Sequence, residues 1–406
     1  MTTRRTTSSN KQRRKHFLMG ILATCVMSAC NDNSSQKSVD IKQETTSSSS
    51  STKNLLPPDG KTLMIIGQDS DTISEYVANM PEDNIEGVTL YSQLKSNSTD
   101  TTLFGIFQSA NWQAGDVSFE KTLLESPDAA LALGLSLDQC NQAPHSQNLT
   151  DGKYDQALKE LVNYLTSLAP RKVFLRIGYE FDGPWNCYEP ASYKTAFRKI
   201  ALALDEANAN NVATVWQGAA WPDSYGNDIY NTANPDHLDT WYPGDDVVDW
   251  VGVSVFYRDL SQWNYVPPTT PDAGQQALLE FARNKQKPVI IAEAAPQGYR
   301  IEGLTQSPIQ ENLPTATTAE AIWQNWYQPF FDFIDDNKDV IRAVAYINAN
   351  WESQGMWHCS PGIAAGQQGC NQGNWGDSRV HVNDYIKQRW LEQVNNAQRW
   401  VQSGNY

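Results

Sequence analysis

VFLRIGYEFDGPW, residues 173–185, is the stretch of this sequence that most restricts the fold. Its first five residues are an apolar run of strand length, and the run ends in an aromatic, polar turn that carries Glu180. The stretch KPVIIAE, residues 287–293, repeats this arrangement 113 residues later (293 − 180) and ends on Glu293. A buried strand that carries an ionisable side chain at its carboxyl end is typical of a parallel barrel.

Strand-like apolar runs recur along the chain, and several are separated by segments with helical periodicity. Near-continuously apolar strands that alternate with helices predict a parallel sheet covered on both sides. Eight strands favour closure into an α/β fold of the (β/α)8 TIM barrel type over an open, doubly wound sheet. The eight predicted strands are Thr62–Ile66, Gly87–Tyr91, Ala129–Leu135, Val173–Ile177, Val212–Trp216, Trp250–Val255, Pro288–Ala292 and Ala343–Ile347. The clearest predicted helices are Tyr154–Leu168, Ala191–Ala207, Gly274–Asn284, Ala319–Asp335 and Val382–Gln402.

A dinucleotide-binding sheet is disfavoured by the residues after the first strand. Gly67-Gln68-Asp69-Ser70 stands there in place of the glycine-rich loop that binds a pyrophosphate. Asp69 is also a candidate site residue, but a helix N-cap explains it equally well.

The N-terminal sequence predicts export. The first 29 residues carry six cationic side chains, no acidic one and an apolar run, which together predict a signal peptide at residues 1–29. The signal ends in Met27-Ser28-Ala29-Cys30, which resembles a bacterial lipoprotein signal with Cys30 as the lipidated residue. Residues 30–58 are polar and Ser-rich, so we expect a flexible tether, followed by a single barrel domain at residues 59–406. The expected location is the outer membrane or cell surface, with the periplasm or the medium as alternatives.

The charge excludes one class of partner. The formal net charge is 31 − 46 = −15, and loss of the six cations of the signal makes it −21. Without a basic patch, the chain is not expected to bind nucleic acid. We expect contact with a membrane only through the lipid, and we expect a monomer.

Four cysteines remain in the predicted domain, and an even number in an exported protein predicts disulfides. Cys359 and Cys370 are close enough in sequence to clip one loop, whereas Cys140 and Cys187 both follow predicted strands on the same face of the barrel. No Cys/His cluster has the spacing of a zinc site, so we expect no metal and no other cofactor.

The positions of Glu180 and Glu293 predict chemistry. By the strand count they follow strands four and seven, on the carboxyl-terminal face where barrel active sites lie. We expect about 5 to 5.5 Å between the two carboxyl groups, which is the spacing of a glycoside hydrolase that retains configuration. One carboxyl group then needs a raised pKa to protonate the leaving oxygen, while the other stays ionised and attacks the anomeric carbon.

Glu residues at strands four and seven of a barrel resemble those of glycoside hydrolase clan A. Within that clan the chain is most similar to family 26, which includes endo-β-mannanases and β-1,3-xylanases. The matching features are Arg176–Trp185, the strand end at Trp216, Tyr242–Gly252 and Lys287–Glu293. The resemblance implies Glu180 as the general acid/base and Glu293 as the nucleophile.

One residue departs from the family pattern, and two more have implied roles. Tyr179 precedes Glu180, where family 26 mannanases usually have His, and a phenol does not titrate near neutral pH. Arg176, inside an apolar strand, needs a carboxylate partner, either Glu293 or an ion pair elsewhere. Tyr257 resembles the clan tyrosine that donates a hydrogen bond to the nucleophile, although the neighbouring Phe256 leaves the register open.

Aromatic side chains could bind sugar rings, because the chain has 14 Trp and 17 Tyr and such rings stack on the apolar faces of sugars. Trp351 follows the last strand and, as in other clan A barrels, could form the floor under the cleaved sugar. Further candidate platforms are Trp185, Trp216 and Trp221, each of which could equally pack in the core. We also expect Asp182 and Asn186 to hydrogen-bond ring hydroxyls.

These features together predict an exported endo-acting glycoside hydrolase that cleaves a β-linked polysaccharide with retention of configuration. β-Mannan and β-1,3-xylan are the expected substrates. Two alternatives stay open at this point. One is a clan A hydrolase of another family that acts on a marine or exopolysaccharide. The other is a surface glycan-binding lipoprotein without catalytic activity.

Overall fold

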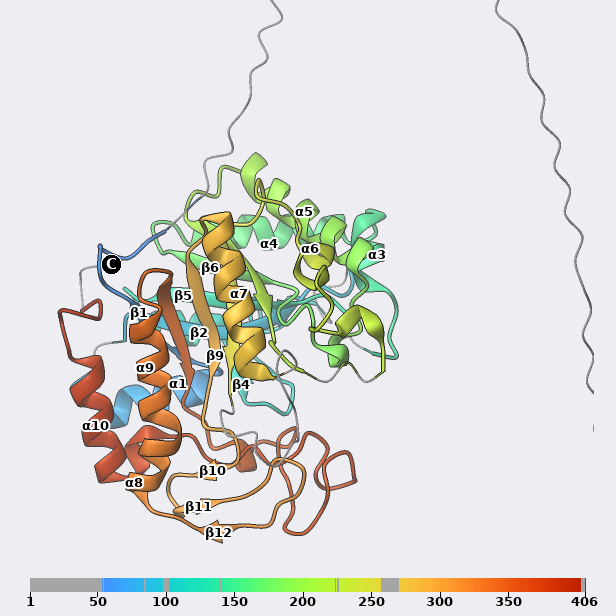
Figure 1. Ribbon diagram of the computed structural model, residues 1–406. Coiled ribbons are helices and arrows are strands. Elements are labelled where there is room, and N and C mark those ends of the chain that lie inside the picture. The colour runs from blue at the N-terminus through green and yellow to red at the C-terminus, as the bar shows by residue number, and fades with distance from the viewer. Residues whose placement is uncertain are drawn as a thin grey trace, which may run out of the picture. The chain divides into compact units, whose positions relative to one another are not determined.

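The computed structural model describes residues 53, 55–83, 85–97, 102–138, 140–222, 224, 226–256, 270–402 and 406. The predicted signal peptide, Cys30, most of the predicted tether and Tyr257 lie outside these residues. Eight parallel strands close into a barrel, each paired with the next and β13 with β1, so the predicted TIM barrel is confirmed (Figure 1). The strands are β1 (Leu63–Gly67), β2 (Gly87–Gln93), β5 (Ala130–Ser136), β6 (Val173–Ile177), β7 (Val212–Gly218), β8 (Trp250–Val255), β9 (Val289–Ala294) and β13 (Ile341–Ile347).

Helices cover the outside of the barrel, as α7 and α9 do in Figure 1. They form because apolar residues recur every three or four positions. On α5, for example, Tyr193, Phe197, Ile200 and Leu204 make one buried face. The helices are α1 (Ser70–Asn79), α2 (Phe119–Glu125), α3 (His145–Thr150), α4 (Asp155–Ser167), α5 (Pro190–Glu206), α6 (His237–Trp241), α7 (Pro271–Lys285), α8 (Ala319–Ile322), α9 (Gln328–Asp336) and α10 (Asp384–Val394).

The barrel interior is a packed core rather than a pore. Alternate strand residues point inward, and the rings of Phe174 and Trp250 meet edge to face with centroids 5.0 Å apart. The intervening residues point outward and pack against the helices. The polar side chains of the candidate site lie towards the carboxyl ends of the strands.

Two predicted helices differ from the structure. The segment predicted as one helix over residues 319–335 contains a π-helical turn, Trp323–Tyr327, between α8 and α9. Pro329 has no backbone N–H to continue the α-helical pattern there, and the N–H of Gln328 bonds to the carbonyl of Trp323 instead. The helix predicted to reach Gln402 ends at Val394, because the chain beyond it turns back and Trp400 pairs with Thr62, just before β1.

The amino-terminal end of the barrel is closed by both ends of the described chain. The Val401 N–H donates to the carbonyl of Thr62, and the Tyr406 hydroxyl donates to the carbonyl of Leu55. Lys53, within the predicted tether, also contacts this end of the barrel, because its backbone N–H donates to Asp249 over 2.8 Å.

Long loops and short strands cover the carboxyl-terminal end. A three-stranded sheet of β10 (Tyr299–Arg300), β11 (Thr305–Gln306) and β12 (Thr315–Ala316) follows β9, at the lower edge of Figure 1. A hairpin of β3 (Ala110–Asn111) and β4 (Asp116–Val117) follows β2. Both predicted disulfides, Cys140–Cys187 and Cys359–Cys370, are present in the loops at this end.

Candidate active site

Glu180 lies in a tight turn just beyond β6. Gly178 and Glu180 both have left-handed backbone conformations, with φ of 56° and 52°, which is unusual for a residue with a side chain. Three hydrogen bonds fix the turn: the Gly183 N–H donates to the carbonyl oxygen of Glu180, and the Asn186 amide donates to the carbonyls of Tyr179 and Glu180. The turn therefore directs Glu180 from the strand end with little freedom.

Both carboxylate oxygens of Glu180 have partners. Ser254 on β8 donates its hydroxyl to Oε1 over 2.9 Å, and the indole of Trp185 donates to Oε2 over 2.9 Å. Burial, and next the negative charge of Glu293, raise the pKa of Glu180 to about 8. This carboxyl group is consequently protonated at neutral pH, as a general acid must be.

Glu293 reaches the barrel mouth because β9 contains a bulge. On β8, Val253 pairs with Ile291 but Ser254 pairs with Glu293, so β9 has one extra residue at this point. Ala292 points into the barrel core, and the extra residue turns the next side chain inward as well. Bulges next to active sites commonly redirect a side chain in this way.

The Glu293 carboxylate is held by two donors. Arg176 donates to Oε1 over 2.6 Å, and the Tyr91 hydroxyl donates to the same oxygen over 2.8 Å. Arg176 is fully buried and also donates to the carbonyl of Ala292 over 2.7 Å. The carboxylate partner predicted for Arg176 is thus Glu293, and Arg176 and Tyr91 both hold the same oxygen of this side chain.

Tyr91 was not among the residues singled out from the sequence, although it ends a predicted strand. It reaches Glu293 only because β5 has a glycine opposite. A Cβ atom on Gly134 would lie 2.5 Å from Cδ1 of Tyr91 and 2.7 Å from Nη2 of Arg176. Trp112, in the loop of the β3–β4 hairpin, was not singled out from the sequence either. Its ring centroid lies 6.2 Å from that of Tyr91.

The predicted sugar platforms are placed differently from one another. Trp216 is fully buried and stacks on Phe181 with ring centroids 4.3 Å apart, so the prediction that it binds a sugar is wrong. It lies at an outward-facing position of β7 and packs under the helices. Trp185 is 36% exposed and meets the half-buried Trp221 edge to face, so this pair keeps an accessible face.

Asp182 and Asn186 also differ from the prediction, because their polar groups bind the protein itself. Asp182 is 1% exposed; its Oδ1 accepts from the backbone N–H of Ala219 over 2.5 Å, and its Oδ2 lies 3.7 Å from Nε2 of His237. The Asn186 amide holds the Glu180 turn, as described above. Asp69 likewise caps α1, where it accepts from the N–H groups of Asp71 and Thr72.

Trp351 lies just beyond β13 in an aromatic cluster. Its ring is 4.8 Å from that of Trp375 and 5.3 Å from that of Trp357, and Ala295, two residues after Glu293, belongs to the same cluster. Its indole donates to the Ser378 hydroxyl over 3.1 Å. Trp351 therefore lies beside the carboxyl ends of β9 and β13, but it is only 1% exposed, so it differs from the prediction of a sugar floor.

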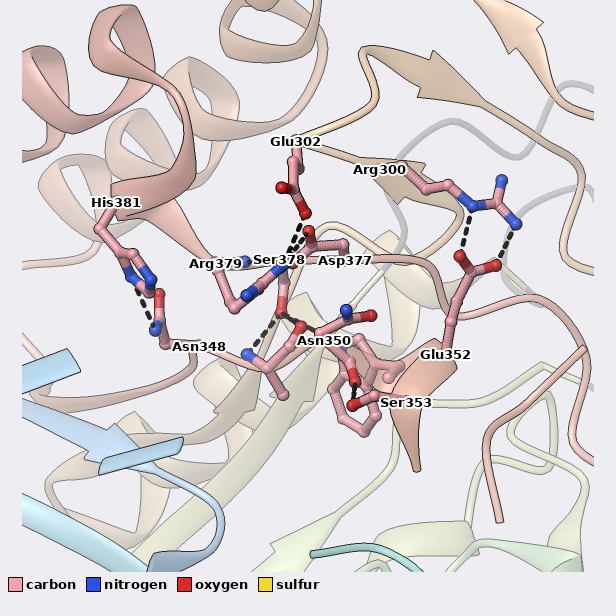
Figure 2. Close-up of polar contacts among 12 residues, drawn as sticks. Arg300, Glu302, Asn348, Asn350, Glu352, Ser353, Asp377, Ser378, Arg379 and His381 are labelled. Carbon is pink, nitrogen blue, oxygen red and sulfur yellow. Dashed lines mark hydrogen bonds and ion pairs between the residues drawn. The ribbon is translucent and has the colours of Figure 1, made fainter. Parts of the chain in front are cut away.

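Ion pairs hold the loops that follow β9 and β13 (Figure 2). Arg300 on β10 binds Glu352 through two of its nitrogens. Arg379 binds Asp377 and Glu302, which joins the loop after β13 to the loop after β9. These ion pairs hold the loops after β9 and β13 together at the carboxyl-terminal end of the barrel.

Within the described residues, no group of three or more His, Cys, Asp or Glu side chains is arranged to hold a metal ion. The described helices include none of the length and apolarity needed to cross a membrane.

No family model matches the chain. The chain is 35% identical over 340 residues to the β-1,3-xylanase TXYA of a Vibrio species and 33% identical over 345 residues to a β-1,3-xylanase of an Alcaligenes species. The matches cover 83% and 84% of the chain, and the chain spans 65% of the length of each relative. In fold it is similar to the family 26 β-mannanase of Bacteroides ovatus, with a TM-score of 0.51, 13% identity, and coverage of 85% of this chain and 91% of that one. The resemblance to glycoside hydrolase family 26 is confirmed.

Tyr179 is the residue at which the sequence predicts a departure from the family 26 mannanases, and it directly precedes Glu180. Its ring lies edge-on to that of Tyr91 at 5.4 Å, and its pKa is raised, mainly by burial and next by the charge of Glu293. Tyr179 is thus a phenol that stays neutral beside Glu180.

Proposed function

We propose that this chain is an endo-acting glycoside hydrolase of family 26 that retains configuration. The observation that carries the proposal is the contrast between two carboxyl groups. Glu180 has its pKa raised to about 8, whereas Glu293 accepts hydrogen bonds from Arg176 and Tyr91. Carboxyl groups with opposed environments are the acid and the nucleophile of a double displacement.

Glu180 acts as the general acid/base. In the first step its proton passes to the leaving glycosidic oxygen while Glu293 attacks the anomeric carbon and the glycosidic bond breaks. Glu180, now ionised, then removes a proton from water, which displaces Glu293 from the covalent intermediate. Ser254 and Trp185 stabilise the ionised form of Glu180 between the two steps.

The proposed substrate is β-1,3-xylan. The two curated relatives are named β-1,3-xylanases and match over more than four fifths of the chain. Tyr179 supports a substrate other than mannan, because it replaces the His that adjoins the reactive sugar in the mannanases. Trp185 and Trp221, which keep an accessible face, are proposed to contact the sugars.

We also propose that the protein is exported and anchored through Cys30 as a monomeric lipoprotein. Two disulfides in the described domain support an oxidising compartment. A lipid on Cys30 would be detected as a mass shift that a Cys30→Ala variant lacks.

Hydrolysis of a polysaccharide panel tests the proposed function. We expect xylooligosaccharides from β-1,3-xylan, a fall in viscosity before reducing sugar accumulates, and products whose NMR spectrum first shows the β-anomer. Glu293→Ala should lose turnover and, with azide, form the inverted glycosyl azide. Binding of xylan without products would favour the non-catalytic glycan-binding alternative, and cleavage of another polysaccharide would favour a different substrate. Unchanged hydrolysis by Glu293→Ala would reject the mechanism.

A further inference from the structure

The Cys140–Cys187 disulfide is attached to the turn that carries Glu180. Cys187 directly follows Asn186, whose amide donates to the carbonyl oxygens of Tyr179 and Glu180 over 3.1 Å each. The other sulfur, that of Cys140, lies 3.2 Å from the carbonyl oxygen of Trp185. The cross-link is therefore one residue from Asn186, which holds the backbone of Glu180, and two residues from Trp185, which holds its carboxylate.

The turn needs such support because two of its residues have left-handed backbones. Glu180 has φ of 52° and Cys187 has φ of 53°. A residue with a side chain is destabilised there by about 1 kcal/mol or more, and it keeps the conformation only where the surroundings hold it. The proposed acid is thus in a conformation that an unrestrained loop would leave.

The other cysteine of the disulfide, Cys140, lies in a loop after β5 that is fixed to the barrel. Asp138, just after β5, accepts from the backbone N–H groups of His145 over 2.6 Å and Ser146 over 3.2 Å. The hydroxyl of Tyr188 accepts from the N–H of Leu137 over 3.4 Å. Cys140 therefore ties the Glu180 turn to a second loop that is itself anchored on both sides.

Glu293 itself makes none of these contacts. Its position comes from the β9 bulge, and its partners Arg176 and Tyr91 lie on strands β6 and β2. Loosening the Glu180 turn would consequently leave the nucleophile in place.

We propose that the Cys140–Cys187 disulfide is a positioning element for Glu180 and that the acid/base steps depend on it while nucleophilic attack does not. This inference rests on the proposed function. General acid catalysis requires the carboxyl group to be within hydrogen-bonding reach of the leaving oxygen, and small displacements are costly.

The test compares two double variants on two substrates. Cys140→Ser/Cys187→Ser lacks this disulfide, and Cys359→Ser/Cys370→Ser lacks the other and serves as the matched control. The substrates are a β-1,3-xylooligosaccharide, whose leaving group needs a proton, and 2,4-dinitrophenyl β-xylobioside, whose leaving group does not. The measured quantity is kcat/KM, which reports the first chemical step.

We expect the Cys140/Cys187 variant to lose at least about tenfold in kcat/KM on the oligosaccharide and to stay within about threefold on the dinitrophenyl substrate. Azide should raise its kcat on the dinitrophenyl substrate, because azide attacks the intermediate without a general base. The control variant should match the wild type on both substrates within about twofold.

Equal losses on both substrates, or no loss on either, would overturn the inference while the proposed function stands. A wild-type protein that cleaves neither substrate would reject the proposed function and the inference with it.

If the Cys140/Cys187 variant does not fold, the folded Cys359/Cys370 variant is treated with dithiothreitol. The reagent gives two electrons and two protons to the remaining disulfide and becomes a cyclic disulfide. The same difference between substrates is then expected, and its absence rejects the inference.

Discussion

Arg176 and Glu293 form a buried ion pair across the mouth of the barrel, 117 residues apart in sequence, with 2.6 Å between Nη2 and Oε1. The Arg176 side chain is fully buried and that of Glu293 is 9% exposed. Charges removed from water are tolerated only when they are paired and hydrogen-bonded. The pair therefore serves the fold and the proposed nucleophile at once.

Arg176→Met is expected to reduce the free energy of unfolding by about 3 to 5 kcal/mol at neutral pH, because Glu293 is left as an unpaired buried charge. Chemical denaturation with guanidinium chloride measures the loss. The matched control is Arg198→Met, which breaks an ion pair with Asp246 whose side chains are 37% and 54% exposed. That loss should stay under about 1 kcal/mol. Equal losses for the two variants would contradict this account of the buried pair.

Tyr91→Phe removes one hydrogen bond to Glu293 and keeps the ring that packs against Tyr179 and Arg176. A hydrogen bond to a charged group contributes about 1.5 to 3 kcal/mol, so kcat/KM should fall roughly 10- to 100-fold. Tyr164→Phe, on α4 in the outer layer, is the control and should change kcat/KM by less than about twofold. Steady-state kinetics on the xylooligosaccharide measure kcat/KM for both variants. A Tyr91→Phe variant with the kcat/KM of the wild type would show that this hydrogen bond does not support the nucleophile.

The barrel could be predicted from the sequence because its strands are buried on both faces and are therefore apolar throughout. Glu180 and Glu293 followed from the same pattern, since each interrupts an apolar run at a strand end. The place where α10 ends could not be predicted, because it depends on pairing between residues 62 and 401. Contacts between distant segments leave no local signal.

Two details of the site could not be predicted from the sequence, because they also depend on contacts between distant segments. The bulge that turns Glu293 inward appears only in the register between β9 and its neighbours. Tyr91 meets Glu293 across 202 residues. The burial of Trp216, in contrast, could have been anticipated: Val215 points into the barrel, so the next residue on the strand points outward.

Gly134→Ala is expected to disturb the site without touching either carboxylate. The added Cβ atom would meet the Tyr91 ring at 2.5 Å and Arg176 at 2.7 Å, so both side chains must shift away from Glu293. Overpacking of this kind costs about 1 to 3 kcal/mol, and we expect both a lower melting temperature and a kcat at least about tenfold lower. Gly303→Ala, whose Cβ would come no nearer than 3.9 Å to Arg300, should leave both values unchanged. A Gly134→Ala protein with full activity would show that the close approach is unimportant.

The pH dependence of catalysis should follow Glu180. Because this group must be protonated to act as an acid, kcat/KM on the xylooligosaccharide should fall above about pH 8, by about tenfold per pH unit. The same parameter for the dinitrophenyl xylobioside should stay flat over that range, since its leaving group needs no proton. An alkaline limb of equal steepness on both substrates would assign the titration to another group.

The raised pKa of Glu180 also predicts how stability changes with pH. The folded protein holds this proton up to about pH 8, whereas the unfolded chain releases it near the ordinary value of 4.5. The unfolded state therefore binds fewer protons between these two values, and the free energy of unfolding falls as the pH rises through this window.

Glu180→Gln removes the titration, so its melting temperature relative to the wild type should rise from pH 4 to pH 8.5. Glu189→Gln, at an exposed position before α5, serves as the control and should show a constant difference. A constant difference for Glu180→Gln as well, measured by calorimetry across this range, would mean that the folded protein does not retain the proton.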